Sequence, residues 1–139
     1  MLEQRDVEAE ALVESPFKGK TGIARVFRAF FYSLAGLSTA WKCESAFRQE
    51  VVLAVVMIPV ACFVPVTPVE RALLVATVLL VLVVELLNSS IEAAIDRIST
   101  DHHLLSKRAK DAGSAAVFMS LVLCGVVWAI LLAPLVLGR

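Results

Sequence analysis

The chain has 139 residues, of which 59% are hydrophobic and 19% are charged, and its mean hydropathy is +0.83. A soluble domain is nearer half apolar, so this composition argues against an ordinary soluble domain and favours one integral membrane domain. The formal net charge is zero, and bulk charge therefore gives no reason to expect a nucleic-acid partner.

The N-terminal part of the chain is the most polar. Residues 1–20 carry five acids and three bases, and we expect them to form an acidic flexible tail ahead of a membrane domain at 21–139. In residues 22–43 apolar side chains recur with the period of a helix, while Arg25 and Arg28 lie in the same segment. A one-sided helix of this kind is typical of the membrane interface, so we predict an amphipathic surface helix.

Three uncharged apolar runs follow, at 51–66, 72–84 and 112–138. A hydrocarbon core of roughly 30 Å needs ~20 residues of helix, so the first two runs need flanking residues to cross it, and we expect spans at about 46–66, 69–97 and 111–137. The first contains Pro59 and ends in the turn signal "VPVTP", whereas the last is free of charge from 112 to 138. The sequence therefore predicts an all-α membrane protein with three transmembrane helices.

Basic residues predict the orientation of these spans, because cytoplasmic loops of membrane proteins are enriched in Lys and Arg. Eight basic residues lie on one side and two, Arg71 and Arg139, on the other. The eight are Arg25, Arg28, Lys42, Arg48, Arg97, Lys107, Arg108 and Lys110. We therefore expect the N-terminus to be cytoplasmic and the C-terminus to lie on the outer side.

The second span ends in the polar stretch "VVELLNSSIEAAIDRIS", residues 83–99. Glu85, Asn88, Glu92 and Asp96 are spaced by three, four and four residues, which places them on one stripe of a helix. The uncharged part before them is short, ~20 Å at ~1.5 Å per residue, so Glu85 is expected inside the hydrocarbon and Glu92 near its cytoplasmic edge. Such a stripe must face protein or water.

Two further polar clusters are predicted at the same edge: "KCESAFRQE" (42–50) and the 96–116 segment, which contains several Lys and Arg. Carboxylates can hold magnesium, basic side chains can hold phosphates, and a buried glutamate can act as a base. These are the parts of a phosphoryl-transfer site, although no GxxxxGK[ST] loop is present. A proton or ion pathway, or polar groups that only join helices, remains an alternative.

The motif "ELLNSSIEAAIDRI" (85–98) resembles the signature of the small bacterial integral-membrane diacylglycerol kinases, and the likeness extends to 39–50 and to "RAKDAGSAAV" (108–117). It covers about residues 21–137. The resemblance implies a homotrimeric bundle in the bacterial inner membrane, with active sites shared between subunits and a periplasmic C-terminus. It also implies Mg²⁺-dependent transfer of the ATP γ-phosphoryl group to diacylglycerol, which gives phosphatidic acid.

The resemblance further implies roles for individual residues. Glu85 matches the general base, Asn88 a neighbouring catalytic-site residue, and Asp96 a supporting residue. Glu44 and Glu92 match carboxylates that hold the metal and the nucleotide phosphates. Nucleotide-contacting positions match Arg25, Tyr32, Asp101, His102, His103, Lys110 and Asp111. Positions around the lipid substrate match Ser33, Trp41, Ala46, Phe47, Arg48, Gln49, Glu50 and Ser114.

One departure from the family pattern lies in the surface helix. Leu34, Ala35 and Ser38 stand where the family has a Trp and two bases, so lipid contacts made by those side chains are not carried over. Two alternatives to the diacylglycerol kinase function stay open. A relative of the same fold phosphorylates undecaprenol, a long isoprenoid alcohol, and a non-catalytic membrane protein could use the stripe as helix contact or ion pathway.

Overall fold

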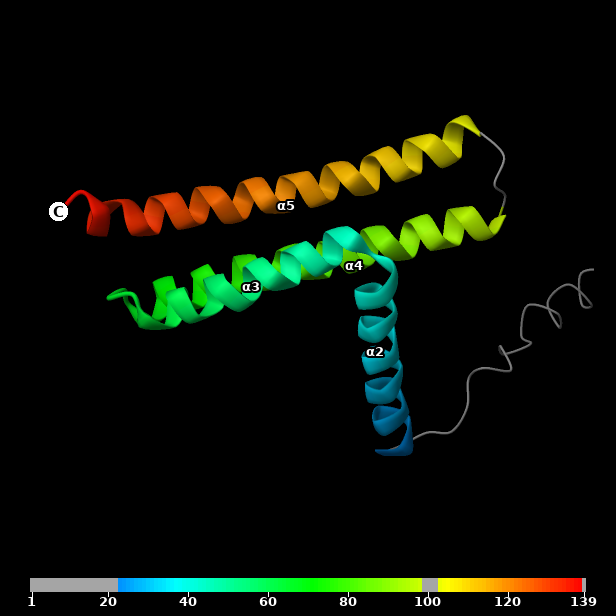
Figure 1. The fold of residues 1–139 in the computed structure, drawn as a ribbon, viewed down its shortest axis with the longest axis horizontal. Coiled ribbons are helices and arrows are strands. Elements are labelled where there is room, and N and C mark those ends of the chain that lie inside the picture. Colours follow the sequence, from blue (N-terminus) through cyan, green and yellow to red (C-terminus); the bar gives the residue numbers. More distant parts are fainter. Residues whose placement is uncertain (1–22, 99–102, 139) are drawn as a thin grey trace, which may run out of the picture. The chain divides into compact units, whose positions relative to one another are not determined.

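The structure, a computed structural model, describes residues 23–98 and 103–138 and contains four helices within these ranges. They are α2 (Ile23–Cys43), α3 (Ser45–Phe63), α4 (Pro68–Ile98) and α5 (Leu104–Val136) (Figure 1). The chain divides into two units, the first ending at Leu37 and the second beginning at Ser38. The acidic tail expected at residues 1–20 lies outside the described residues.

The described part of the first unit is one continuous stretch of α2. Its side chains from Arg25 onward are exposed, and Phe30 and Phe31 meet edge to face with ring centroids 5.9 Å apart. The Ser33 hydroxyl donates to the Ala29 carbonyl oxygen at 2.9 Å, which satisfies that hydroxyl within the helix. The position of this helix at a membrane interface stays a prediction.

The second unit contains three helices that are long and apolar enough to cross a membrane: α3 with 19 residues, α4 with 31 and α5 with 33. For the described residues this confirms the expectation of an all-helical fold with three helices that could cross a membrane. At ~1.5 Å per residue, α4 and α5 are each longer than the roughly 30 Å hydrocarbon core. Because of this extra length, their ends can carry polar side chains beyond the apolar layer.

Proline does not end the first span. Residues Ser45–Phe63 form one helix that contains Pro59, within the span expected at about 46–66. Proline lacks one donor and crowds the preceding turn, but spanning helices tolerate it where neighbouring groups satisfy the freed carbonyl. Helix α5 likewise runs through Pro134 and ends two residues later.

A capping box begins the second span. The Glu70 carboxylate accepts hydrogen bonds from the Thr67 backbone N–H and hydroxyl, both at 2.7 Å, and the Glu70 backbone N–H donates to the Thr67 hydroxyl oxygen at 3.3 Å. This reciprocal pair satisfies donors that a helix start leaves free. Pro68 occupies the first helical position, where its missing N–H has no cost. The tight turn predicted from "VPVTP" is therefore also the signal that starts α4.

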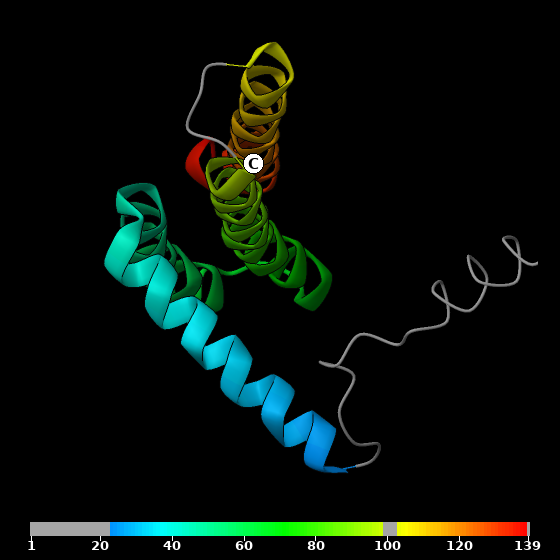
Figure 2. The ribbon, with the colours of Figure 1, turned by 90° about the vertical axis from the view of Figure 1, so that its right-hand side faces the viewer.

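Helix α4 packs against both α3 and α5. A small apolar core joins the three helices and consists of Ala54 from α3, Val78 and Val81 from α4, and Cys124 from α5. Figures 1 and 2 show α5 running alongside α4 in two views. The Trp128 indole N–H donates to the Leu74 carbonyl oxygen at 3.2 Å, so a side-chain hydrogen bond ties α5 to α4 in addition to apolar contact.

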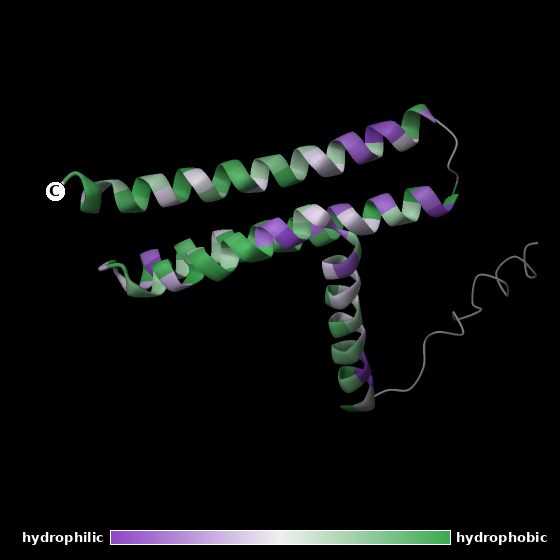
Figure 3. Ribbon diagram, viewed as in Figure 1, coloured by the Kyte–Doolittle hydropathy of each residue, from purple (hydrophilic) through white to green (hydrophobic). Residues whose placement is uncertain are grey.

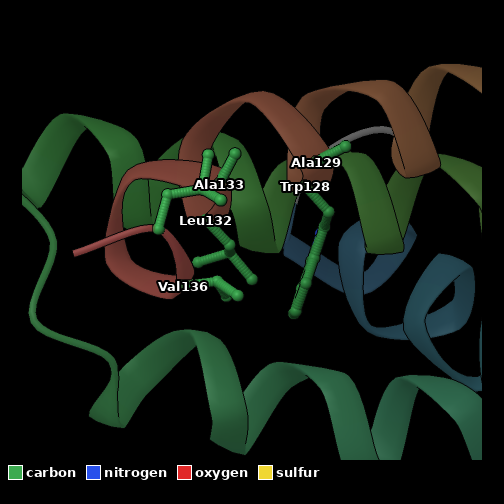
Figure 4. Close-up of a pocket in the computed structure, with 6 residues that line it drawn as sticks. Trp128, Ala129, Leu132, Ala133 and Val136 are labelled. Atoms are coloured by element: carbon green, nitrogen blue, oxygen red, sulfur yellow. The ribbon is translucent and has the colours of Figure 1, made fainter. Parts of the chain in front are cut away.

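Polarity divides the second unit along its length. Figure 3 shows hydrophilic residues concentrated where α4 ends and α5 begins, while most of the remaining length of α5 is hydrophobic. Near its C-terminus α5 has an apolar surface hollow of about 480 Å³, lined by Trp128, Ala129, Leu132, Ala133, Val136 and Leu137 (Figure 4). The chemistry-bearing side chains therefore lie at the opposite end of α5 from this hollow.

Candidate active site

Glu85 is the centre of the polar stripe on α4. Only 4% of its surface is exposed, although it follows an apolar run in a helix that can cross a membrane. The carboxylates of Glu44 and Glu92 lie close enough to interact electrostatically with that of Glu85, and Glu85 acts in the same way on Glu50. Four acidic side chains from α3, α4 and the α2–α3 junction therefore converge, and like charges so gathered repel one another.

The stripe points into the helix packing at its start and into solvent at its end. Glu85 is buried, Asn88 and Glu92 are partly buried, and Asp96 is exposed. The Asn88 side-chain amide donates from Nδ2 to Glu92 Oε1 at 3.3 Å, which links two members of the stripe one helical turn apart. This order agrees with the expectation that the stripe faces protein rather than lipid. The depth of each residue in a membrane stays a prediction.

Helix α5 supplies basic and backbone groups opposite the stripe. Lys110 donates from Nζ to Asp96 Oδ1 at 2.5 Å and so joins α5 to the end of α4. One turn earlier, Lys107 pairs with Asp111 within α5, also at 2.5 Å. Lys110 is thus placed beside the acidic stripe, whereas Asp111 is exposed and neutralised by its own helix.

Glu44 lies where α2 ends and α3 begins. Its backbone is extended at the N-cap position of α3. This interruption leaves the last carbonyls of α2 without backbone N–H partners in their own helix. The Arg48 guanidinium donates to two of them, the Trp41 oxygen at 3.1 Å and the Lys42 oxygen at 3.2 Å. Arg48 therefore holds the end of α2 against the first turn of α3, next to the Glu44 carboxylate.

The other residues predicted around the lipid substrate differ in their exposure. Phe47 is buried, while Ala46, Gln49, Trp41 and Ser114 are exposed. Glu50 is partly buried, and its Oε2 has no hydrogen-bond partner among the residues that the structure describes. It lines a small cleft of about 40 Å³ between the three helices, whose other lining residues are Leu53, Ala54, Met57, Val78, Val81, Leu121 and Cys124.

The remaining predicted nucleotide positions lie on α2, at the start of α5 or outside the described ranges. Arg25 and Tyr32 are exposed on α2 in the first unit, and the predicted lipid residue Ser33 belongs to the same segment. Asp101 and His102 lie outside the described residues. His103 is the N-cap of α5, where its Nδ1 accepts from the Leu105 backbone N–H at 3.2 Å, a contact that the sequence did not indicate.

Gly113 is a residue of the site that the sequence reasoning did not single out. It is buried in α5, and a Cβ built on it would lie 2.3 Å from Asn88 Oδ1. The available signal was its place in the interior of a helix, where glycine weakens the helix and usually has a packing reason. Only the register between α4 and α5 shows which side chain this glycine faces.

The chain is similar to known proteins over most of its length. Residues 31–132 match the family described as prokaryotic diacylglycerol kinase. The diacylglycerol kinase of Pseudomonas aeruginosa is 56% identical over 118 residues, covering 85% of this chain and 96% of that protein. Those of Escherichia coli strain K12 and Helicobacter pylori strain 26695 are 47% and 46% identical, over 81% and 83% of this chain and 92% and 89% of theirs.

Proposed function

We propose, from the premise that the chain belongs to the prokaryotic diacylglycerol kinase family, that its carboxylate cluster transfers the γ-phosphoryl group of ATP to the hydroxyl of diacylglycerol. The chain is a membrane enzyme and a diacylglycerol kinase, and ATP is the co-substrate that a kinase implies. The names of the relatives do not favour the undecaprenol alternative. The product of the proposed reaction is phosphatidic acid.

The observation that carries the choice of site is the burial of Glu85 at 4% exposure among other carboxylates. Polar residues that only join helices form hydrogen bonds with each other, whereas Glu85 is buried away from water and is repelled by the carboxylates of Glu44 and Glu92. Burying a carboxylate among like charges lowers the free energy of unfolding, and a catalytic role for Glu85 accounts for an arrangement with this cost. We assign Glu85 as the general base that takes the proton of the lipid hydroxyl as its oxygen attacks phosphorus.

Glu44 and Glu92 are the residues that would hold Mg²⁺. Within the described residues no group of three or more His, Cys, Asp or Glu is arranged to hold a metal ion, but magnesium commonly binds through one or two carboxylates together with water and substrate phosphates. The carboxylates gathered around Glu85 are oxygen ligands of the kind that such an ion takes. When bound, the ion would neutralise charge on the transferring phosphates.

The remaining roles follow from the chemistry of the side chains. Lys110 lies beside the stripe through its pair with Asp96 and is the basic residue proposed to position the phosphates. Asn88 donates to Glu92 and is proposed to orient it. The contributions of Arg25, Tyr32, Asp111 and the 101–103 stretch to the nucleotide are proposed from the family likeness.

The homotrimer with shared active sites is also a proposal. It is supported by polar side chains such as Gln49 and Ser114, which are exposed on span-capable helices and would be costly facing lipid. The excess of Lys and Arg at one end of the helices supports an inner-membrane protein with a cytoplasmic N-terminus, a periplasmic C-terminus and a surface helix at residues 22–43.

A competition assay tests this function. The purified protein receives magnesium and γ-labelled ATP in micelles that contain diacylglycerol and undecaprenol at equal mole fraction. We expect label in phosphatidic acid and little in undecaprenyl phosphate. Preferential labelling of undecaprenol would assign the chain to the alternative substrate, and absence of label from both lipids would contradict the enzymatic function and favour the non-catalytic or ion-pathway alternative.

A further inference from the structure

We propose that Gly113 is a positioning residue that fixes the side-chain amide of Asn88 and, through it, the carboxylate of Glu92. The inference rests on the proposed function in one respect, because it takes Glu92 as a ligand of the magnesium–nucleotide complex. Gly113 does not touch a substrate in this account. It acts by leaving the space that the Asn88 side chain occupies.

The contact between the two residues is closer than any other residue type would allow. The position of a Cβ on Gly113 is 2.3 Å from Asn88 Oδ1 and 3.4 Å from Asn88 Cγ, and real Cβ atoms do not approach other heavy atoms within about 3 Å. Gly113 is buried, and Asn88 Oδ1 is fully buried. The side-chain carbonyl of Asn88 therefore fills the place where every other residue would carry its Cβ.

The space at Gly113 lets the Asn88 amide lie where its nitrogen end reaches Glu92. Among the described residues Asn88 Oδ1 has no hydrogen-bond partner, and it is directed at the backbone of Gly113. The Nδ2 end donates to Glu92 Oε1 at 3.3 Å. If the amide turned over, an acceptor oxygen would face the Glu92 carboxylate and a donor would face carbon. Held as it is, the amide donates to one oxygen of Glu92, and we assign the other oxygen to the ligand.

A methyl group at position 113 should move a side chain rather than a helix. The atoms nearest to the added Cβ are Asn88 Oδ1 and Cγ, the far end of a side chain, and the nearest backbone atom of that residue, its Cα, is 3.9 Å away. Alanine also favours a helix interior over glycine. Gly113→Ala should therefore keep the helix pair together while it displaces the amide that orients Glu92.

The test compares Gly113→Ala with Gly125→Ala, a matched control in the same helix where a Cβ has nothing within 4 Å. Binding of Mn²⁺ with a non-hydrolysable ATP analogue is measured by the spin-resonance signal of free Mn²⁺, and the Tm is measured in the same detergent. Loss of a group that orients a metal ligand typically weakens metal affinity ~10–100-fold. We expect that change for Gly113→Ala, with KM for diacylglycerol unchanged and Tm equal or higher, and no change for Gly125→Ala.

The same substitution in an Asn88→Ala variant tests whether the effect of Gly113→Ala acts through the Asn88 amide. In Asn88→Ala the displaced group is absent, so the further substitution Gly113→Ala should weaken Mn²⁺–analogue binding no more. Equal weakening in both backgrounds, wild-type binding by Gly113→Ala, or a fall in Tm with loss of the oligomer would each overturn the proposal. Glu92→Gln tests separately whether Glu92 is a ligand and whether Gly113 positions it through Asn88. If it binds like wild type, the proposed ligand is wrong, whereas weakening by Glu92→Gln but not by Gly113→Ala contradicts only the positioning role.

Discussion

Leu74 allows a quantitative test of the packing that holds the site, because it is the large side chain with no remaining exposure. In soluble proteins Leu→Ala at a buried position costs about 2.7–5.0 kcal/mol, and roughly 0.8 kcal/mol of this belongs to the transfer of each of the three lost carbon atoms from water. In a membrane lipid is as apolar as leucine. The transfer part therefore drops out, and roughly 0.3–2.6 kcal/mol remains for the cavity.

The assay for Leu74→Ala is reversible unfolding in mixed micelles, followed by kinetics on the folded enzyme. We expect a loss of free energy of unfolding within that range and an unchanged kcat, because Leu74 lies eleven residues, or ~16 Å, along α4 from Glu85. Leu73→Ala is the calibrating variant, since Leu73 keeps 48% of its exposure. If Leu74→Ala costs nothing, or costs as much as the same change in a soluble protein, the reasoning about the core is wrong.

Two further predictions concern the polar edge. Asp96→Asn should lower the free energy of unfolding by no more than ~1 kcal/mol, because its pair with Lys110 is partly exposed, yet it should reduce kcat/KM for ATP since Lys110 loses the partner that holds it. A stability loss well above this value would contradict the expectation. Arg48→Ala should speed tryptic cleavage after Lys42 ~30-fold, because its two hydrogen bonds to the last carbonyls of α2 contribute about 1 kcal/mol each. Unchanged cleavage would show that the end of α2 is held by other contacts.

The polar stripe could be predicted from the sequence because its geometry is local. The spacing of Glu85, Asn88, Glu92 and Asp96 fixes one face of a helix, and the cost of a carboxylate in hydrocarbon requires that face to meet protein or water. The burial of Glu85 and the exposure of Asp96 agree with this reasoning. The three span-capable helices were predictable for a similar reason, since length and hydrophobicity are properties of each segment alone.

Features that depend on how two helices meet could not be predicted in the same way. The contact of Gly113 with Asn88 requires the register between α4 and α5, which neither helix specifies by itself. Helix α5 begins at Leu104, seven residues before the span expected at 111, because His103 caps a first turn that precedes the uncharged run.

The central claim is that Glu85 acts as the base in phosphoryl transfer to a lipid hydroxyl. The most direct measurement is the rate at which label passes from γ-labelled ATP to diacylglycerol in micelles, for the parent protein and for Glu85→Gln with its oligomeric state verified. The account predicts a ~10²–10⁴-fold lower kcat and a Tm that is unchanged or higher, since a buried charge has been removed. A kcat within a few-fold of the parent, or a large fall in Tm, would contradict it.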